Sequence, residues 1–229
     1  MSFRRHAIYF TPPPGALADI GAAWLGWDSA TGKAAGPCAV PGLPAHATEI
    51  TETPRRYGLH ATLAPPFRLA EGQTEDALHD ALARLCHGTA PVTIDSLRIA
   101  AMGRFLALVP TATPPALGAL AADAIRAVDG LRAPLSAAEL ARRRSATLTP
   151  EQDANLVRWG YPYVMSAFRF HITLTGKRPR AELPMIRDAL ARHLMPAVPR
   201  PFVIDAASLM GEDAQGRFHL IRRQPLGSG

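Results

Sequence analysis

Two His-x-Thr-Leu segments stand out because their residue types and spacing could do chemistry. The first begins at His60 and continues through Thr62, and the second begins at His171 and continues through Thr173. Polar and apolar residues alternate from 168 to 176, and successive side chains of a strand point to opposite faces. Each histidine therefore shares a polar strand face with the threonine two residues on, about 7 Å away.

The chemistry that suits such a pair is acid–base catalysis at phosphorus. An imidazole titrates near neutral pH, so one histidine can accept a proton while the other donates one. Phosphoryl displacement runs in line, which places the attacking and leaving oxygens on opposite sides. The pattern predicts His60 and His171 as the catalytic pair, with Thr62 and Thr173 donating to phosphate oxygens. Arg169 favours a neutral His171, so we expect His171 as the base and His60 as the acid.

Four further residues are candidates for contacts with the substrate. Arg169 shares the predicted face of His171, and its planar guanidinium matches phosphate oxygens, with a surface salt bridge as the alternative. Tyr57 and Arg56 lie just before the first motif, and Tyr57 could equally pack in the core. Tyr163 precedes the second motif and could stack on a base.

Other catalytic signatures are absent from the sequence. Neither motif has Asp or Glu at ligand spacing, and no His-x-His or His-x-x-x-His occurs, so we expect no metal site. No phosphate-binding GxxxxGK[S/T] loop, no GxGxxG before a helix and no GxSxG is present, and we expect no cofactor. The two cysteines, Cys38 and Cys86, do not form a disulfide framework.

The elements around the two motifs follow each other in the same order. From each histidine, "ALAR" begins 21 and 18 residues on, the aspartate of "ID" lies 35 and 34 residues on, and "GRF" begins 43 and 45 residues on. Three landmarks at nearly equal offsets indicate an internal duplication. We therefore expect the two histidines on adjacent central strands, one from each copy, lining one cleft.

The duplication sets the expected domain organisation. The chain of 229 residues is predicted to be a single bilobal domain. Its parts are repeat one at about 57–110, repeat two at about 168–223, and the flanking and connecting segments 1–56 and 111–167.

Periodicity and capping residues predict an α+β fold with two antiparallel sheets around a central cleft. Thr74 and Thr149 are the expected N-caps of two helices. Strands are expected where β-branched and aromatic residues alternate with polar ones. The longer expected helices are 16–27, 74–86, 114–130 and 181–194.

Charge and hydropathy restrict the class of protein. The formal net charge is +6, and 23 arginines stand against two lysines. A GC-rich genome and phosphate recognition both explain this bias, and composition does not separate them. No basic run exceeds the three arginines at 142–144, which disfavours a protein that coats nucleic acid. No apolar run approaches about 20 residues and no secretory signal is evident, so we expect a cytoplasmic monomer without membrane contact.

The paired "HATL" and "HITL" resemble the motifs of the 2H phosphoesterase superfamily. The segments "RHAIYFTPPPG", "RRYGLHATLAPPFRL", "GRFLALVP", "ELARRR" and "RWGYPYV" resemble a bacterial branch of unknown function whose genes accompany phosphonate-metabolism operons. The resemblance covers nearly the whole chain and implies a metal-independent phosphoesterase acting on 2′,3′-cyclic or related phosphodiesters. That branch often carries an acidic residue after "PYV", where this chain has Met165 and Ser166.

The expected function is hydrolysis of a cyclic or 2′–5′-type phosphodiester of a nucleotide or phosphorylated ribose. Two alternatives stay open, a non-catalytic module that binds nucleotides or RNA ends and a ligase that uses the same residues. The intact histidine pair favours an enzyme, because a binding module needs no two proton carriers. The expected partners are a small cyclic phosphate, a short nucleotide or an RNA end.

Overall fold

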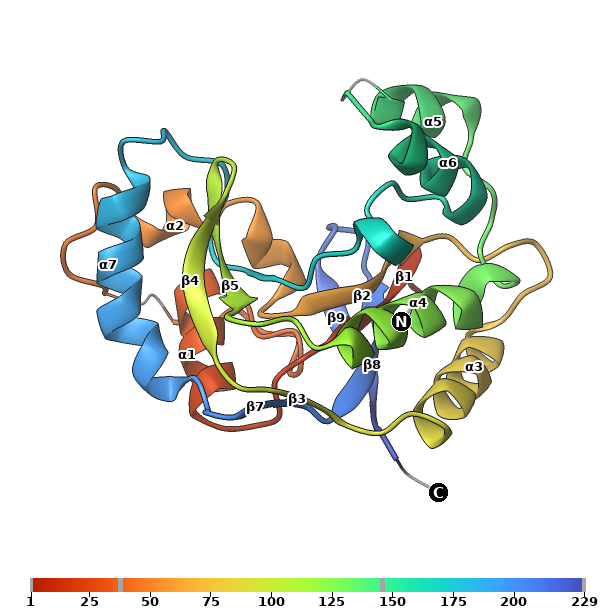
Figure 1. Ribbon diagram of the computed structural model, residues 1–229, viewed down its shortest axis with the longest axis horizontal. Helices are drawn as coiled ribbons and strands as arrows, with labels where there is room; N and C mark the ends of the chain where they lie inside the picture. Colours follow the sequence, from red (N-terminus) through yellow and green to blue (C-terminus); the bar gives the residue numbers. More distant parts are fainter. Residues whose placement is uncertain (1, 37–38, 145–146, 228–229) are drawn as a thin grey trace.

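The computed structural model describes residues 2–36, 39–144 and 147–227, whose strands form two antiparallel sheets (Figure 1). The larger sheet has the order β4-β5-β6-β2-β1-β8-β9, and the smaller one pairs β3 with β7. The expected α+β class with two antiparallel sheets is confirmed, although the sheets are very unequal in size. The strands are β1 (Arg5–Phe10), β2 (Ala61–Phe67), β3 (Val92–Ile94), β4 (Leu97–Met102), β5 (Phe105–Pro110), β6 (Ile172–Thr173), β7 (Phe202–Ile204), β8 (Ala206–Glu212) and β9 (Phe218–Pro225).

Two helices begin where their capping residues predict, at Thr74 and Thr149. The Thr74 side chain accepts a hydrogen bond from the backbone N–H of Ala77, and Thr149 and Gln152 form a reciprocal capping box. The α-helices are α1 (Ala16–Leu25), α2 (Ala47–Ile50), α3 (Glu75–His87), α4 (Pro115–Asp129), α5 (Ala137–Arg144), α6 (Pro150–Trp159) and α7 (Leu183–Leu194). The 3₁₀ helices are η1 (Pro54–Tyr57), η2 (Met165–Ala167) and η3 (Met195–Ala197).

Each side of the molecule is assembled from both predicted repeats. The β4–β5 hairpin lies in the first predicted repeat, yet β5 pairs with β6 and the hairpin packs against α7, both from the second. Conversely, α3 of the first repeat packs against β8 and β9 of the second. The smaller sheet joins the corresponding strands β3 and β7, with Val92 opposite Ile204. The two predicted repeats therefore exchange elements in the fold, and neither packs by itself.

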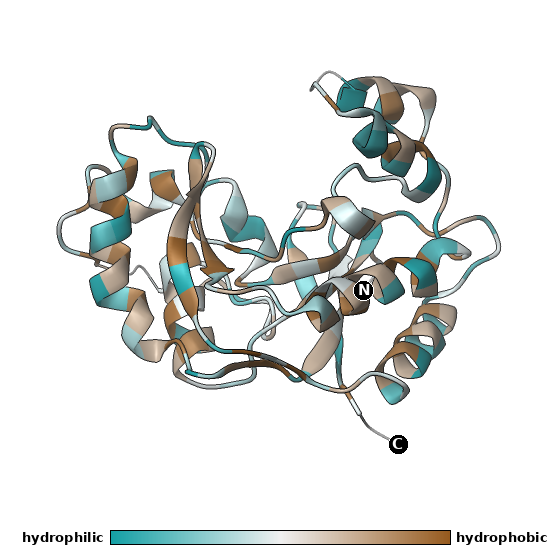
Figure 2. Ribbon diagram, in the orientation of Figure 1, coloured by the Kyte–Doolittle hydropathy of each residue, from teal (hydrophilic) through white to brown (hydrophobic). Residues whose placement is uncertain are grey.

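The apolar core lies between the sheet and the helices that cover it (Figure 2). Leu63 of β2, Leu108 of β5 and Ile172 of β6 are almost fully buried in it. The Trp24 indole of α1 donates a hydrogen bond to the carbonyl oxygen of Leu174, at 2.8 Å. This contact fixes α1 to the chain just after the second motif. No helix within the described residues is long and apolar enough to cross a membrane.

Candidate active site

The strands β2 and β6 place both motifs beside each other at the centre of the larger sheet. They pair antiparallel with Ala61 opposite Ile172, and both of these side chains are buried. The residues on either side of this pair point to the other face, which is partly exposed. In the antiparallel register, His60 lies across from Thr173, and Thr62 across from His171. The two histidines are thus diagonal neighbours, with Cα atoms about 7–8 Å apart.

A backbone carbonyl holds each imidazole in one orientation. His60 Nδ1 lies 2.9 Å from the Gly58 carbonyl oxygen, and His171 Nδ1 lies 2.8 Å from that of Arg169. A carbonyl oxygen only accepts, so each Nδ1 carries the hydrogen and donates it. Each Nε2 is then left with the lone pair or proton that a substrate would meet. In both motifs the imidazole donates to the backbone carbonyl two residues before the histidine, so the same local hydrogen bond occurs twice.

The burial of His60 decides which ring stays neutral. Burial lowers the pKa of His60 to about 4, against a smaller opposing effect of its bond to Gly58, and the nearby His171 lowers it further. At neutral pH His60 is therefore an uncharged ring, able to accept a proton. The lowered pKa favours His60 as the proton acceptor, whereas the neighbouring Arg169 led to the opposite expectation.

Aromatic rings surround the two histidines. The Tyr9 ring stacks on His60 with centroids 4.0 Å apart, and the Tyr57 ring lies 5.6 Å from it. Phe218 stacks on Tyr57 at 5.1 Å. On the other side, the Phe105 ring lies 6.0 Å from His171. These rings restrict the imidazoles to the positions that their backbone bonds set.

Sequence reasoning did not assign Tyr9, Phe105 or Phe218 to the site. For the two phenylalanines a signal existed, since both end the repeated landmark "GRF". In the fold, one lies against the second histidine and the other against the tyrosines around the first. Tyr9 had no such signal, because its approach to His60 depends on the pairing of β1 with β2.

The remaining predicted residues lie at the edge of the histidine pair. The Arg169 side chain is exposed, and its carbonyl is the group that contacts His171. Arg56 is exposed, with its guanidinium 5.2 Å from the Tyr57 ring centre. Tyr163 is 46% exposed and packs edge-on against Tyr161. The described residues contain no group of three or more His, Cys, Asp or Glu side chains arranged to hold a metal ion.

The chain belongs to the family described as "Protein of unknown function (DUF1045)", which matches residues 62–219. Two curated relatives carry the name "Ribose 1,5-bisphosphate phosphokinase PhnN". The protein from Janthinobacterium sp. (strain Marseille) is 38% identical over 221 residues, covering 94% of this chain and 49% of the relative. The protein from Laribacter hongkongensis (strain HLHK9) is 34% identical over 220 residues, covering 95% and 51%. The chain spans about half the length of these relatives.

Solved structures with a similar chain course include phosphoesterases. E. coli LigT complexed with NADP⁺ matches at 18% identity and a TM-score of 0.45, covering 99% of this chain and all of LigT. A protein titled "phosphoesterase" matches at 20% identity and a TM-score of 0.42, covering 97% of this chain and 98% of its own. TT0787 of Thermus thermophilus matches at 14% identity and a TM-score of 0.46, with the same coverage. At these identities and TM-scores, the similarity carries no argument about the chemistry of this chain.

Proposed function

We propose that this DUF1045 protein is a metal-independent phosphoesterase that opens a cyclic or 2′–5′-type phosphodiester of a nucleotide or phosphorylated ribose. One observation carries the proposal. Two histidines lie diagonally across the β2–β6 ladder, each donating from Nδ1 to a backbone carbonyl and each placed opposite a threonine. Both Nε2 atoms are then available on one sheet face, as a proton acceptor and a proton donor for one phosphorus.

The proposed reaction balances with protein groups and water alone. His60, held neutral by burial, takes a proton from water while the water oxygen forms a bond to phosphorus. The opposite P–O bond of the diester breaks, and its electron pair stays on the leaving oxygen. His171, in its protonated form, gives that oxygen a proton. The hydroxyls of Thr62 and Thr173 donate to the non-bridging oxygens, where negative charge accumulates.

The name of the relatives narrows the proposed substrate class. Ribose 1,5-bisphosphate carries one phosphate on O1 and one on O5. Hydrolysis of a ribose 5-phosphate whose O1 and O2 share a cyclic phosphate yields this compound when the bond to O2 breaks. A domain that produces ribose 1,5-bisphosphate in this way would supply the substrate of a kinase domain in the same protein. We therefore propose a ribose cyclic phosphate with a second phosphate as the preferred substrate.

A phosphokinase is the second candidate function, because both curated relatives carry that name. The sequence contains no GxxxxGK[S/T] loop of the kind that cradles nucleotide phosphates in many kinases. The match covers about half of each relative, so the kinase function can belong to the other half. We assign the phosphoesterase activity to the half that this chain represents.

A substrate screen in EDTA tests the proposal. The screen contains 2′,3′-cyclic nucleotides, ribose cyclic phosphates and short 2′–5′ oligonucleotides, with the His60→Ala/His171→Ala double variant as the control. We expect metal-independent hydrolysis by the wild type and none by the double variant. Turnover that needs an added divalent ion would contradict the mechanism. ATP-dependent phosphorylation of ribose 1,5-bisphosphate by this chain would favour the kinase, and binding without turnover would favour a module that recognises nucleotides.

A further inference from the structure

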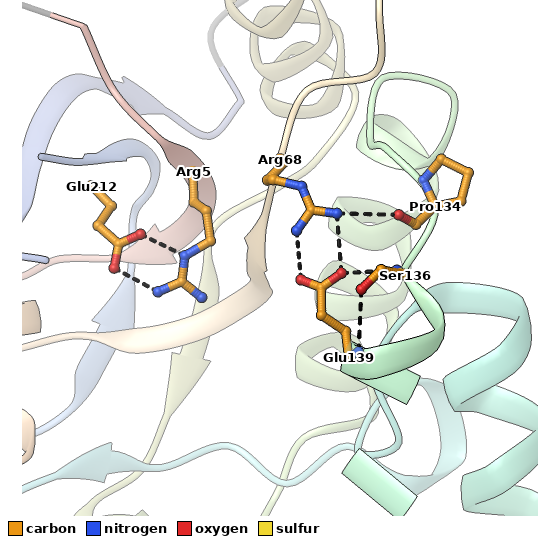
Figure 3. A network of polar contacts seen from close by, with 6 residues as sticks. All are labelled: Arg5, Arg68, Pro134, Ser136, Glu139 and Glu212. Carbon is orange, nitrogen blue, oxygen red and sulfur yellow. Dashed lines mark hydrogen bonds and ion pairs between the residues drawn. The ribbon is translucent and has the colours of Figure 1, made fainter. Parts of the chain in front are cut away.

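A pocket rich in arginine lies between the end of β2, α4 and the α5–α6 helices, and Figure 3 shows two of its arginines, Arg5 and Arg68, with their carboxylate partners. Five arginines line it, and Glu139 is the one carboxylate among its lining residues within the described chain. Such an excess of guanidinium groups is typical of sites for anions, above all phosphate. The five are Arg5, Arg68, Arg132, Arg142 and Arg143.

Three of these arginines already have carboxylate partners. Arg5 makes two hydrogen bonds of 2.5 Å to Glu212, and Arg68 bonds both oxygens of Glu139 at 2.5 and 3.0 Å. Arg132 lies 3.1 Å from Asp129. These pairs fix the guanidinium groups in place, and they consume most of the negative charge near the pocket.

Arg143 differs, because no ion pair or hydrogen bond of its guanidinium occurs within the described part of the chain. Its Nε is buried without a hydrogen-bond partner, and its guanidinium lies 5.2 Å from the centre of the Tyr161 ring. Burial lowers the pKa of Arg143, which reflects the cost of removing the cation from water. A half-buried cation with an unpartnered N–H is destabilised until an anion reaches it.

Two sets of residues relate this pocket to His60. Along β1, Arg5 and Tyr9 lie on the same face, about 13 Å apart along the strand, and Tyr9 stacks on His60. Tyr161, which Arg143 covers, makes a minor contribution to the raised pKa of Tyr9, whose main cause is burial. Contact with both the histidines and this pocket requires a substrate that carries a second phosphate, because inorganic phosphate has only one.

We propose that the pocket around Arg143 and Arg68 is a second anion site, which binds the non-reacting phosphate of the substrate while the histidines act on the cyclic one. The inference rests on the proposed function and specifies its substrate as a phosphomonoester that also carries a phosphodiester. Arg143 is then a residue that determines specificity. Its terminal N–H groups bind phosphate oxygens, while Arg5 and Arg68 line the same pocket from positions fixed by Glu212 and Glu139.

Binding without turnover gives the first test. Ribose 5-phosphate is titrated into the His60→Ala/His171→Ala double variant, labelled with ¹⁵N so that arginine Nε–H signals are observed. We expect the Arg143 signal to shift with saturation, at a concentration below that needed for inorganic phosphate. An unchanged Arg143 signal overturns the inference, and saturation by inorganic phosphate at equal affinity reduces the pocket to a general phosphate site. Neither result depends on catalysis.

Substrate discrimination gives the second test. Adenosine 2′,3′-cyclic phosphate is compared with the same compound carrying a 5′-phosphate. We expect the ratio of their kcat/KM values to favour the phosphorylated compound in the wild type and to fall about 10–100-fold in Arg143→Met. Arg126→Met removes an exposed arginine of α4 and should keep the wild-type ratio. Thermal unfolding establishes that both variants fold.

The two tests distinguish a failure of the second anion site from a failure of the proposed phosphoesterase activity. Turnover of cyclic phosphates with an unchanged ratio in Arg143→Met would leave the phosphoesterase standing and overturn the second site. A shifted Arg143 signal without any turnover would keep the second site and overturn the phosphoesterase. The titration uses variants with native arginines, so it decides the matter even where Arg143→Met does not fold.

Discussion

At the residue scale, the two halves of the candidate site share one design but differ in exposure to water. In each motif a carbonyl two residues earlier orients the imidazole, and a threonine from the opposite strand faces it. Burial under the Tyr9 ring then sets His60 apart as the neutral ring. This asymmetry, and not the neighbouring Arg169, is the basis of the proposed assignment of base and acid.

We predict that His60→Ala and His171→Ala each lower kcat/KM by at least about 10³-fold, and that the double variant is little worse than either, because the two act in one step. A p-nitrophenyl diester has a leaving group that needs no acid. It should restore turnover in His171→Ala and not in His60→Ala. Rescue of His60→Ala alone would reverse the roles, and full activity of both variants would remove the mechanism.

The hydroxyl groups of Thr62 and Thr173 should stabilise charge on the phosphate. Replacing either threonine by valine keeps the shape and removes one donor, so we predict a loss of about 10²-fold in kcat with little change in KM. Thr175→Val is a suitable contrast, because the Thr175 hydroxyl serves the backbone of Leu106 and Gly176. It should lower thermal stability more than catalysis. Wild-type turnover by the Thr62→Val/Thr173→Val protein would show that the hydroxyls have no such role.

The low pKa of His60 also predicts how stability depends on pH. In the unfolded chain a histidine takes up a proton near pH 6.5, whereas folded His60 does so only near pH 4. Between these values the unfolded state binds more protons, so the free energy of unfolding should fall as pH drops from about 6.5 to 4. Urea denaturation across this range should show a shallower fall in His60→Gln than in the wild type. Identical slopes would mean that folding does not lower the pKa of His60.

At the element scale, the short turn before β2 sets the position of the first histidine. Gly58 follows η1 with φ of 71°, and a Cβ there would lie 2.7 Å from the Ser29 hydroxyl oxygen. Its carbonyl is the acceptor for His60.

We predict that Gly58→Ala moves this carbonyl and lowers kcat/KM by about 10-fold or more, through a misplaced His60. Gly72→Ala is the matched control, because Gly72 has φ of 78° and open space around its Cβ position. Both variants should lose some stability from the positive φ, and kinetic assays should show the activity loss in Gly58→Ala alone. Equal activity of the two variants would contradict the role of the turn.

Local sequence signals predicted the helices and caps well, since side-chain hydrogen bonds at Thr74 and Thr149 act over three residues. They predicted the second motif less well. A strand was expected over 168–176, yet only Ile172–Thr173 has ladder pairing. The reason is tertiary, because the Thr175 hydroxyl accepts the N–H of Leu106 and redirects the chain. The arginine pocket was also unforeseen, since its members come from segments far apart in sequence.

At the scale of the whole molecule, the two predicted repeats are intertwined. The duplication itself stays a prediction, supported by the same β-α-β-β-β order in 57–110 and 168–225. The similar offsets of the sequence landmarks predict this order of elements. They do not predict that α3 and α7 each pack against strands of the other predicted repeat, because such contacts produce no regular spacing in the sequence.

Because of this exchange, we predict that the lobes do not unfold separately. Differential scanning calorimetry of the intact chain should give one transition, with equal calorimetric and van't Hoff enthalpies. A chain cut between 111 and 114 should leave two fragments that are each unfolded alone and regain structure when mixed. Two resolved transitions, or an independently folded fragment, would show that the lobes are separate units.

The larger sheet is narrowest at β6, because this strand has only two residues. A two-residue strand joins β5 to β2, and one residue pair, Ala61 with Ile172, links it to β2. His60 lies on the β2 side of this junction together with Arg5 and Arg68, and His171 lies on the other side. The spacing of the two imidazoles therefore depends on this single residue pair, whereas the spacing between His60 and the arginines does not.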